Sequence, residues 1–338
     1  MTGQVPQDMR AMLLQAPRQP LVPRRVRLPR VQPGQVLVRV SACGVCRTDL
    51  HIADDELQPP SLPLILGHEI VGSVVQVAED VAGLEVGARV GVPWLAWTDQ
   101  TCALCLAGRE NLCPAARFTG YHVDGGYAEY VAANADYCFP LPDQPAAAQA
   151  APLLCAGLIG YRTWRLAGDN VEHLGIYGFG AAAHIIAQVA SHQGQRVYAF
   201  TRPGDRHTQD FARHLGAAWA GGSDQRPPHP LDAALIFAPV GSLVVAALEA
   251  TAPGGSVVCG GIHMSDIPSF AYSLLWQERQ IRSVANLTRE DGHAFFDLIA
   301  GMQLRISVRT FAPDAANDAL EAMRHGALTG AAVLDWGA

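Results

Sequence analysis

The sequence has 338 residues, of which 49% are hydrophobic and 16% are charged, and its formal net charge is −7. All 24 basic residues are arginine, because lysine does not occur in the chain. This composition excludes the reactions that depend on lysine, which include phosphate-loop nucleotide hydrolysis, protein-kinase transfer and Schiff-base chemistry. The slightly acidic balance also argues against nucleic acid or an anionic membrane as the main partner.

The length of the chain exceeds what one hydrophobic core usually covers, so we expect two domains. The opening residues MTGQVPQDMR contain no long apolar run, and the longest apolar stretches, near 150–160 and 243–250, are too short to span a bilayer. We therefore expect a cytoplasmic protein. Its eight cysteines, some in Cys-x-x-Cys spacing, favour metal ligands or redox groups over a disulfide framework.

Residues 1–150 are predicted to be rich in β-structure. Short runs of strand-forming residues alternate there with Gly, Pro and Asp, and no apolar period of helix length occurs. The predicted strands cover residues 36–40, 70–77, 88–92 and 127–131.

From about residue 171 the pattern alternates between strand and helix. A strand at 173–177 is followed by apolar residues at helical spacing over 183–190 and by a second strand at 196–200, which together predict a βαβ unit. Further predicted elements are strands at 231–237, 256–259, 281–285 and 332–334, and helices at 242–250 and 315–324.

A glycine-rich motif, Gly178-Phe-Gly180-Ala-Ala-Ala183, lies between the first strand and the helix of this βαβ unit. Gly178 would permit a tight turn, Gly180 would let the backbone approach a pyrophosphate, and Ala183 would let the helix pack closely on the sheet. In this context the motif predicts a dinucleotide site, although the same residues could form a plain strand-to-helix turn.

The end of the predicted strand at 196–200 indicates which dinucleotide the site would bind. An NAD site would place an acidic residue there, whereas this chain has Thr201 and Arg202, with Arg206 four residues further on. A hydroxyl and two guanidinium groups suit a 2′-phosphate better, so we favour NADP over NAD. The alternative is that the two arginines belong to a solvated loop.

Two groups of metal-binding residue types occur in the first half of the chain. Cys46, His68 and the later Cys155 would supply sulfur, nitrogen and sulfur ligands to a zinc ion whose fourth position stays open for water or substrate. Taken singly, a buried cysteine or a lone histidine is more often structural.

The second group consists of Asp99, Cys102, Cys105 and Cys113, whose short spacings describe a closed structural zinc loop. Asp99 could equally be a surface charge. A disulfide among the three cysteines is the other alternative, and it would leave one of them unpaired.

The sequence resembles the zinc-dependent alcohol dehydrogenases of the medium-chain dehydrogenase/reductase superfamily. The resemblance covers essentially the whole chain and rests on CGVCRTDLH (43–51), GHE (67–69), CALCLAGRENLC (102–113), GGYAEY (125–130), PLLCAG (152–157) and GFGAAA (178–183). It implies a mainly β GroES-like catalytic domain of residues 1–151, completed by 288–338. It also implies an α/β Rossmann cofactor domain of residues 152–287.

The resemblance implies roles for individual residues. Cys46, His68 and Cys155 would bind the catalytic zinc. Thr48 would hydrogen-bond the alcohol oxygen, and His51 would pass its proton to solvent.

Three further residues complete the implied site. Asp49 and Glu69 would be carboxylates behind the zinc ligands, and Trp94 would line the substrate pocket, unless it is an ordinary core aromatic. Three features depart from the family pattern: Asp99 stands where cysteine is usual, Thr201 replaces the acid that binds NAD, and residues 330–334 (GAAVL) lack an arginine that many members have there. Arg206 lies where members often have lysine.

The implied activity is reversible hydride transfer between a primary or secondary alcohol and NAD(P)+, with two zinc ions per chain. We expect small alcohols and aldehydes as substrates and a homo-oligomer, either a dimer or a tetramer. The alternatives are a polyol, cinnamyl-type or formaldehyde dehydrogenase of the same superfamily, or a non-catalytic redox sensor that binds zinc and nucleotide.

Overall fold

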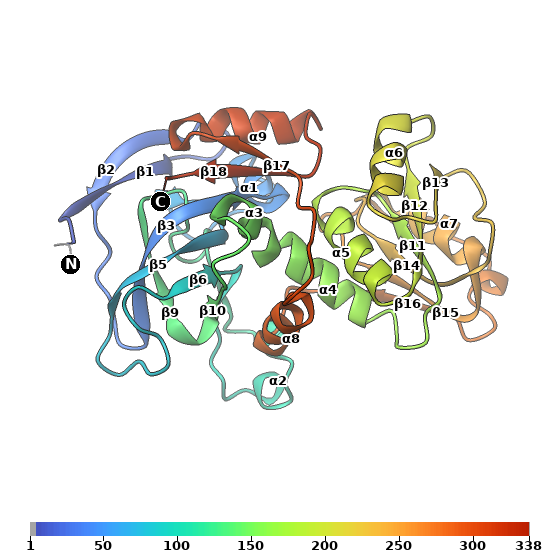
Figure 1. The fold of residues 1–338 in the computed structure, drawn as a ribbon, viewed down its shortest axis with the longest axis horizontal. Helices are drawn as coiled ribbons and strands as arrows, with labels where there is room; N and C mark the ends of the chain where they lie inside the picture. The colour runs from blue at the N-terminus through green and yellow to red at the C-terminus, as the bar shows by residue number, and fades with distance from the viewer. Residues whose placement is uncertain (1–4, 338) are drawn as a thin grey trace. The chain divides into compact units, whose positions relative to one another are not determined.

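The structure is a computed structural model that describes residues 5–337 (Figure 1). The chain divides into two compact units. The first unit contains the residues up to Cys155, the segment Thr288–Phe296 and the residues from Ser307 onward, and the second unit contains Ala156–Leu287 and Asp297–Ile306. Between residues 5 and 337, no helix is both long and apolar enough to cross a membrane.

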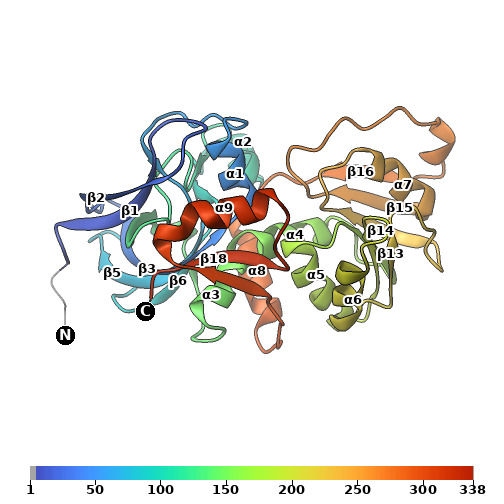
Figure 2. The same ribbon diagram turned by 90° about the horizontal axis from the view of Figure 1, so that it is seen from above.

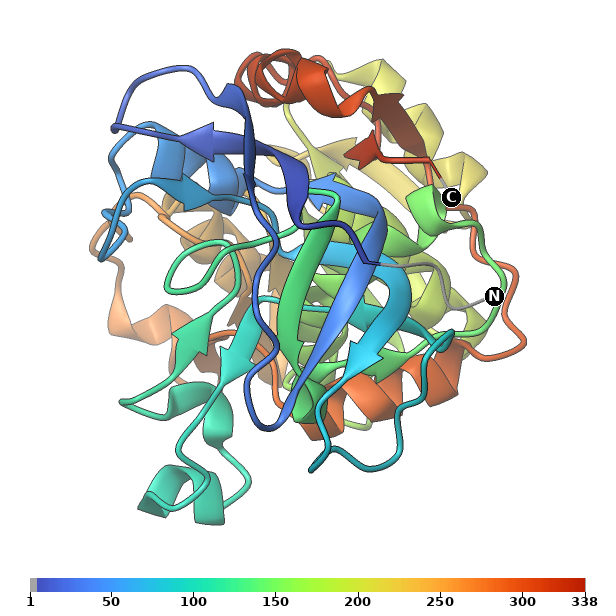
Figure 3. The same ribbon diagram turned by 90° about the vertical axis from the view of Figure 1, so that its left-hand side faces the viewer.

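The first unit is built mainly from β-strands. Its largest sheet has the order β10-β6-β5-β3-β18-β17, and β9 also pairs with β3. The strands of this sheet are β3 (Gln35–Val45), β5 (Glu69–Val77), β6 (Arg89–Val92), β9 (Tyr130–Asn134), β10 (Phe139–Pro140), β17 (Val308–Phe311) and β18 (Ala331–Asp335). Figure 3 shows the green β9, the blue β3 and the cyan β5 side by side.

Two smaller sheets and several short helices complete the first unit. The smaller sheets contain β1 (Asp8–Leu14), β2 (Val22–Arg27) and β4 (Leu64–Ile65), and β7 (Leu95–Trp97) and β8 (Arg117–Phe118). The helices are α1 (Arg47–Ala53), α2 (Ala103–Leu106), α3 (Ala147–Ala150), α9 (Ala316–Arg324) and most of α8 (Arg289–Ile299).

The second unit contains a parallel six-stranded sheet with the order β13-β12-β11-β14-β15-β16. This order is that of a Rossmann sheet, which confirms the predicted fold class. The strands are β11 (His173–Tyr177), β12 (Arg196–Thr201), β13 (Trp219–Gly222), β14 (Leu231–Ile236), β15 (Thr251–Cys259) and β16 (Gln280–Ser283). The helices are α4 (Ala156–Arg165), α5 (Ala181–His192), α6 (Arg206–His214) and α7 (Ser242–Ala250).

Helices cover both faces of this parallel sheet. Figures 1 and 2 show α4 and α5 on one side of the sheet and α7 on the other. Strands β11, β12 and β14 are almost completely buried because both faces are covered, which explains why they appear in the sequence as continuous apolar runs.

Each unit has its own hydrophobic core. Fully burying one large apolar side chain stabilises a fold by about 1.5–3 kcal/mol. The core of the first unit includes Val36, Val38 and Val40 of β3, so this strand is fixed in the middle of its sheet. Strand β3 therefore provides a rigid base for the residues that follow it.

Two sequence predictions need correction. The strand predicted at 127–131 is β9, which begins only at Tyr130 and ends at Asn134. The strand predicted at 281–285 is β16, which begins at Gln280 and ends at Ser283. Tyr127 is buried and precedes β9, because its backbone hydrogen-bonds Met12 and Leu66 instead of β3. Its hydroxyl donates to Asp49.

Candidate metal centres and cofactor site

Cys46 stands between strand β3 and helix α1 of the first unit. It is the N-cap residue of α1, and its backbone N–H donates to the Oδ2 atom of Asp49 at 2.8 Å. This side-chain cap satisfies a backbone donor that the helix itself leaves unpaired. The Cys-x-Thr-Asp sequence therefore starts a short helix with its thiol at the beginning and Thr48 and Asp49 in its first turn.

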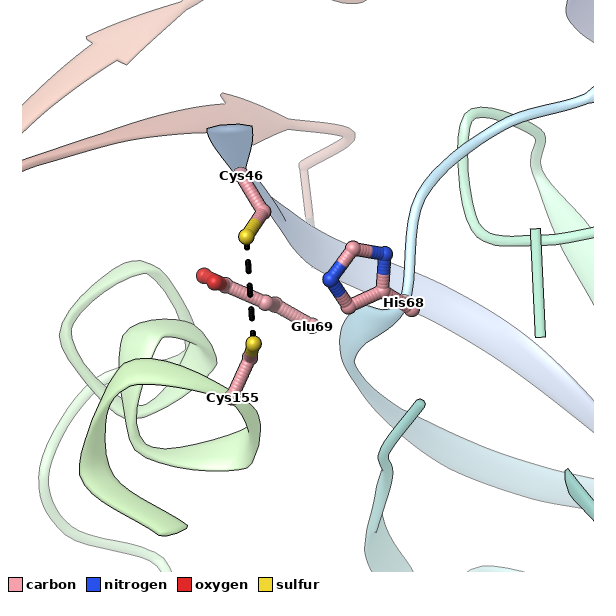
Figure 4. Close-up of side chains that lie close together, drawn as sticks. All are labelled: Cys46, His68, Glu69 and Cys155. Atoms are coloured by element: carbon pink, nitrogen blue, oxygen red, sulfur yellow. Dashed lines mark hydrogen bonds between the residues drawn. The ribbon is translucent and has the colours of Figure 1, made fainter. Parts of the chain in front are cut away.

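Four side chains from distant parts of the first unit meet at this thiol. The ligand atoms of Cys46, His68, Glu69 and Cys155 all lie within 4.8 Å of one another. His68 immediately precedes β5, Glu69 begins it, and Cys155 is the last residue of the long N-terminal part of this unit. Figure 4 shows both thiols and the His68 imidazole facing a common point, with Glu69 beside them.

The distance between the two sulfur atoms fits a shared metal ion. The Sγ atoms of Cys46 and Cys155 are 3.8 Å apart and both cysteines are free, whereas a disulfide requires about 2.05 Å. Two thiolates bound tetrahedrally to zinc at about 2.3 Å would be separated by about 3.8 Å. The geometry therefore fits two ligands to one ion.

Asp49 orients the histidine of this cluster from a fully buried position. Its Oδ1 atom accepts the backbone N–H of Gly67 at 3.1 Å and lies 3.4 Å from Nδ1 of His68. Its Oδ2 atom accepts the Tyr127 hydroxyl at 3.1 Å. With Nδ1 facing the carboxylate, Nε2 faces the two sulfur atoms, as in a carboxylate–histidine–metal arrangement (Figure 4).

The charge distribution of the cluster favours a cation. The hydrogen bond from the Cys155 thiol, assisted by His68, lowers the pKa of Cys46 well below its ordinary value despite burial. Burial raises the pKa of Glu69 well above its ordinary value, and the nearby Cys46 thiolate adds to this shift. These shifts describe anionic groups crowded together out of water, where a divalent ion would compensate their charge.

Three buried atoms of the cluster have no hydrogen-bond partner among residues 5–337: Nδ1 and Nε2 of His68, and Oε2 of Glu69. Nδ1 lies near the Asp49 carboxylate at 3.4 Å. A buried polar atom without a partner is costly, and coordination of a metal ion would satisfy Nε2 and Oε2. The donor set of two sulfurs, one imidazole and one carboxylate fits zinc. The sequence interpretation placed Glu69 behind the ligands, whereas the structure also places its carboxylate among them.

The residues implied for alcohol and proton handling lie on helix α1. The hydroxyl of Thr48 is 3.8 Å from the Cys46 sulfur. His51 follows three residues later and is 9% exposed, and its Nδ1 atom contacts the carboxylate of Glu56. Three residues make nearly one helical turn, so Thr48 and His51 lie on neighbouring parts of one helix face. Sequence inspection did not single out Glu56.

Trp94 lies directly beside the cluster. Its ring meets the His68 ring edge-on at a centroid distance of 4.8 Å. Two further aromatic rings contact Trp94. Phe118 stacks on it at a centroid distance of 5.1 Å, and the Tyr121 ring lies at 5.8 Å. Phe118 and Tyr121 escaped sequence inspection, although their close spacing in FTGYH was the available signal.

The second group of ligand-type residues also converges. The ligand atoms of Asp99, Cys102, Cys105 and Cys113 lie within 4.8 Å of one another, and the three cysteines are free. Asp99 accepts the backbone N–H groups of Thr101 and Cys102, each at 2.9 Å. These hydrogen bonds hold the pKa of Asp99 well below its usual range, and the bond from Cys102 has the largest effect. The Asp99 carboxylate is therefore ionised.

The glycine motif of the second unit forms the turn from β11 into α5. Gly178 has φ +86°, and a Cβ atom there would come within 2.8 Å of the Ala238 backbone nitrogen. Gly180 caps α5, and a Cβ built on it would meet nothing within 4 Å. Ala183, in the first turn of α5, is fully buried. The turn leaves open space at the N-terminus of α5, where an anionic group is favoured.

The residues expected to select the dinucleotide lie at the end of β12. Thr201 is buried, and its hydroxyl accepts a hydrogen bond from the side chain of Gln209 at 3.0 Å. Arg202 and Arg206 are both exposed, Arg206 as the first residue of α6. Sequence inspection did not identify Gln209.

Comparisons with known proteins identify the family. The family model of the alcohol dehydrogenase GroES-like domain matches residues 32–143. The probable alcohol dehydrogenase AdhA of Mycobacterium tuberculosis is 47% identical over 315 residues, which cover 91% of this chain and 90% of that protein. The chain belongs to the zinc-type medium-chain alcohol dehydrogenase family. It is thus an oxidoreductase of the class that acts on alcohols, and the resemblance found in the sequence is confirmed.

Other members agree with this assignment. An alcohol dehydrogenase of Geobacillus stearothermophilus is 36% identical, over 92% of this chain and 94% of that protein. The structure of acetophenone reductase from Geotrichum candidum in complex with NAD has a TM-score of 0.88 and 27% identity, and covers 98% of both chains. The alcohol dehydrogenase of Aeropyrum pernix has a TM-score of 0.86 and 28% identity, over 96% of this chain and 99% of that one.

Proposed function

We propose that this family member uses zinc held by Cys46, His68 and Cys155 to catalyse reversible hydride transfer between a primary or secondary alcohol and a nicotinamide cofactor. The observation that carries this proposal is the convergence of those ligand atoms within 4.8 Å, with Nε2 of His68 buried and unpartnered among the described residues. When bound, zinc supplies a Lewis acid that lowers the pKa of an alcohol hydroxyl, and the nicotinamide accepts the hydride.

The protein's own side chains bind and orient the reactants and move the proton. Asp49 holds the His68 ring through Nδ1, so that Nε2 is presented to the ion. Thr48 places a hydroxyl near the Cys46 sulfur, where it can hydrogen-bond the alcohol oxygen. His51 takes up the alcohol proton and returns it to water. In the opposite direction the same groups deliver a proton to an aldehyde or ketone.

The proposed substrates are small alcohols and aldehydes. Trp94 meets His68 edge-on and is supported from behind by the stacked Phe118. A side chain held on both sides cannot swing away easily, so it limits the room beside the cluster. The relatives named alcohol dehydrogenases support this choice.

NADP is the proposed cofactor, in preference to NAD. The end of β12 carries Thr201 in place of an acid, and the exposed Arg202 and Arg206 follow it. A carboxylate there would repel a 2′-phosphate, whereas guanidinium groups bind phosphate with paired hydrogen bonds. The open space at Gly180 accommodates the pyrophosphate that both dinucleotides share.

A second zinc ion is proposed for the loop that contains Asp99, Cys102, Cys105 and Cys113. Four ligand atoms close together, with no open coordination position required, suit a structural ion. We place the protein in the cytoplasm as a dimer or tetramer, in keeping with the family resemblance of its sequence.

The deciding experiment compares NAD and NADP with the zinc-loaded protein across a panel of short alcohols and aldehydes. We expect alcohol-dependent absorbance at 340 nm with both cofactors and a higher kcat/KM with NADP. A preference for polyols, cinnamyl-type alcohols or formaldehyde would instead identify the protein as the corresponding dehydrogenase of the same superfamily. No hydride transfer with either cofactor would refute the dehydrogenase function and favour a zinc- and nucleotide-binding sensor.

A further inference from the structure

Glu56 contacts the residue proposed to move the proton. Its Oε2 atom lies against Nδ1 of His51. The side chain of His51 is 11% exposed and that of Glu56 is 57% exposed, so the imidazole is largely buried while the Glu56 side chain reaches solvent. The other ring nitrogen of His51, Nε2, is buried. The two nitrogens therefore face different environments, one toward an anion at the surface and one toward the protein interior.

The backbone after helix α1 fixes Glu56 in this position. The helix ends at Ala53, and Asp55 then adopts φ +66°, which reverses the direction of the chain. As a result the backbone N–H groups of Glu56 and Leu57 both donate to the carbonyl of His51, at 2.9 and 3.0 Å. The carboxylate is thus anchored through the backbone to the same residue that its side chain contacts.

The two acidic residues before Glu56 face arginines instead of His51. Asp54 accepts a hydrogen bond from Arg324 of helix α9 at 2.6 Å. Asp55 lies 3.8 Å from Arg18, whose backbone N–H donates to the carbonyl of Ala53 at 2.7 Å. Of the three consecutive acids, Asp54 and Asp55 therefore pair with arginines, and Glu56 turns toward the histidine.

This contact determines which ring nitrogen of His51 carries the proton. An ionised carboxylate can only accept hydrogen bonds, so the neutral imidazole must present N–H at Nδ1. Its lone pair is then on Nε2, the buried nitrogen. An imidazole in the other tautomer would present N–H at Nε2 and could not accept a proton from the interior.

We propose that Glu56 is a positioning residue that fixes the tautomer and orientation of His51. The inference rests on the proposed function, because it assumes that His51 relays the alcohol proton. In the oxidation direction, Nε2 accepts that proton and the ring becomes an imidazolium cation opposite the Glu56 carboxylate. Loss of one proton to water restores the neutral ring, so one proton enters and one leaves in each turnover.

The test compares three variants in kcat and KM. Glu56→Ala removes the acceptor, Glu56→Gln retains a carbonyl oxygen that can accept the Nδ1 proton, and Asp55→Asn removes an equal charge from the adjacent residue. Loss of an orienting partner typically costs about tenfold to a hundredfold in activity. We expect such a loss of kcat in Glu56→Ala with little change in KM, partial recovery in Glu56→Gln, and less than about a twofold change in Asp55→Asn, which leaves the His51 contact intact.

A double-mutant cycle separates positioning from a purely structural role. In a His51→Gln background, adding Glu56→Ala should cause no further loss, because the residue through which Glu56 acts is absent. An additional loss of the same size as in the wild-type background would overturn the proposal. Equal activity of Glu56→Ala and wild type would overturn it as well, while leaving the dehydrogenase function intact.

Nuclear magnetic resonance tests the proposed tautomer of His51 without requiring catalytic turnover. In protein labelled with ¹⁵N-histidine, the His51 resonances, assigned by their absence in His51→Gln, should show a protonated Nδ1 in wild type and a mixture of tautomers in Glu56→Ala. A wild-type ring protonated mainly at Nε2 would contradict the proposal. If wild type instead shows the expected tautomer but transfers no hydride, the proposed function fails and the positioning contact stands.

Discussion

Cys46 shows how one residue can serve two structural purposes. It ends the run from β3 and caps helix α1, and the same backbone geometry directs its thiol toward His68 and Cys155. The helix that it starts carries Thr48 and His51. Fixing Cys46 in space therefore also fixes the side chains proposed to handle the alcohol.

Replacing this cysteine tests the ligand assignment. Cys46→Ala removes one of the three proposed zinc ligands. Loss of a residue that only hydrogen-bonds a metal ligand already costs up to about a hundredfold in activity, so we expect kcat/KM to fall by more than about a hundredfold. Circular dichroism should remain that of wild type, because the core of β3 is untouched. Cys259→Ala, which replaces a half-buried cysteine of the second unit, is the matched control. Retained turnover in Cys46→Ala would contradict the assignment.

Arg206 is the residue that tests cofactor choice. It is exposed at the start of α6, in a chain that has no lysine for the same purpose. A hydrogen bond to a charged group is worth about 1.5–3 kcal/mol, which corresponds to a factor of about 10 to 150. We expect Arg206→Ala to raise KM for NADP by such a factor and to leave KM for NAD within about twofold. Equal effects on both cofactors would show that Arg206 does not bind the 2′-phosphate.

At the scale of elements, the cysteine loop is joined to helix α8. Glu110 lies between Cys105 and Cys113, and its carboxylate accepts hydrogen bonds from the Arg289 side chain at 2.7 and 3.0 Å and from the Arg289 backbone at 2.7 Å. Arg289 also lies over the ring of Tyr137 at 5.0 Å. The loop thus has two kinds of support, a proposed set of metal ligands and an ion pair with the start of α8.

Removing a ligand from the loop should change metal content and stability together. Wild-type protein should contain two zinc ions per chain, and Cys105→Ala should contain one. Because each kcal/mol of lost stability lowers the melting temperature of a large domain by about 2–4 °C, we expect a fall of several degrees. Alcohol turnover should persist at low temperature. An unchanged melting temperature, both in Cys105→Ala and after chelation, would refute a structural metal.

The ion pair itself should be sensitive to acid. Burial acts to raise the pKa of Glu110, but the hydrogen bonds and charge of Arg289 outweigh it, so the pKa lies below its ordinary value. Such a group stabilises the fold above the unfolded-state pKa of about 4.3. That stabilisation is lost as the pH falls through the lower pKa of the folded state.

Glu110→Gln should therefore lower the free energy of unfolding by about 1–3 kcal/mol at pH 7. The difference from wild type should shrink as the pH falls below about 4.3, which urea unfolding at several pH values would measure. The exposed neighbour Glu290 provides the control Glu290→Gln. A difference that stays constant down to pH 3 would mean that the ionised carboxylate is not responsible.

Local sequence patterns predicted some elements better than others. Strand β11 and helix α7 match their predicted residues, because buried parallel strands and their connecting helices have strong apolar patterns. Helix α1 was not predicted, since its seven residues include the buried polar Thr48, Asp49 and His51 and therefore lack an apolar period. Thr48 and His51, the residues proposed to act on the alcohol, thus lie in an element that apolar periodicity does not reveal.

At the scale of the whole molecule, spacing indicated which ligand-type residues belong together, and the structure brings both groups together. Contacts between side chains far apart in the sequence could not be anticipated from local patterns. The Tyr127 hydroxyl on Asp49 and the Phe118 ring on Trp94 depend on how the chain folds back on itself. Glu56 is a further example, because its direction depends on the positive φ of Asp55, which no sequence signal marks.

The pairing of β18 with β3 has a consequence for synthesis of the protein. Leu334 pairs with Cys43 and Ala332 with Val45, so the strand that leads into Cys46 acquires this neighbour from the far end of the sequence. A ribosome makes all six strands of the parallel sheet, the last of which ends at Ser283, before it makes β18. The parallel sheet can therefore form while the chain is still growing, whereas the sheet that contains β3 is completed only after β18 has been made. We expect zinc to be retained by chains that include β18 and lost readily from shorter nascent ones.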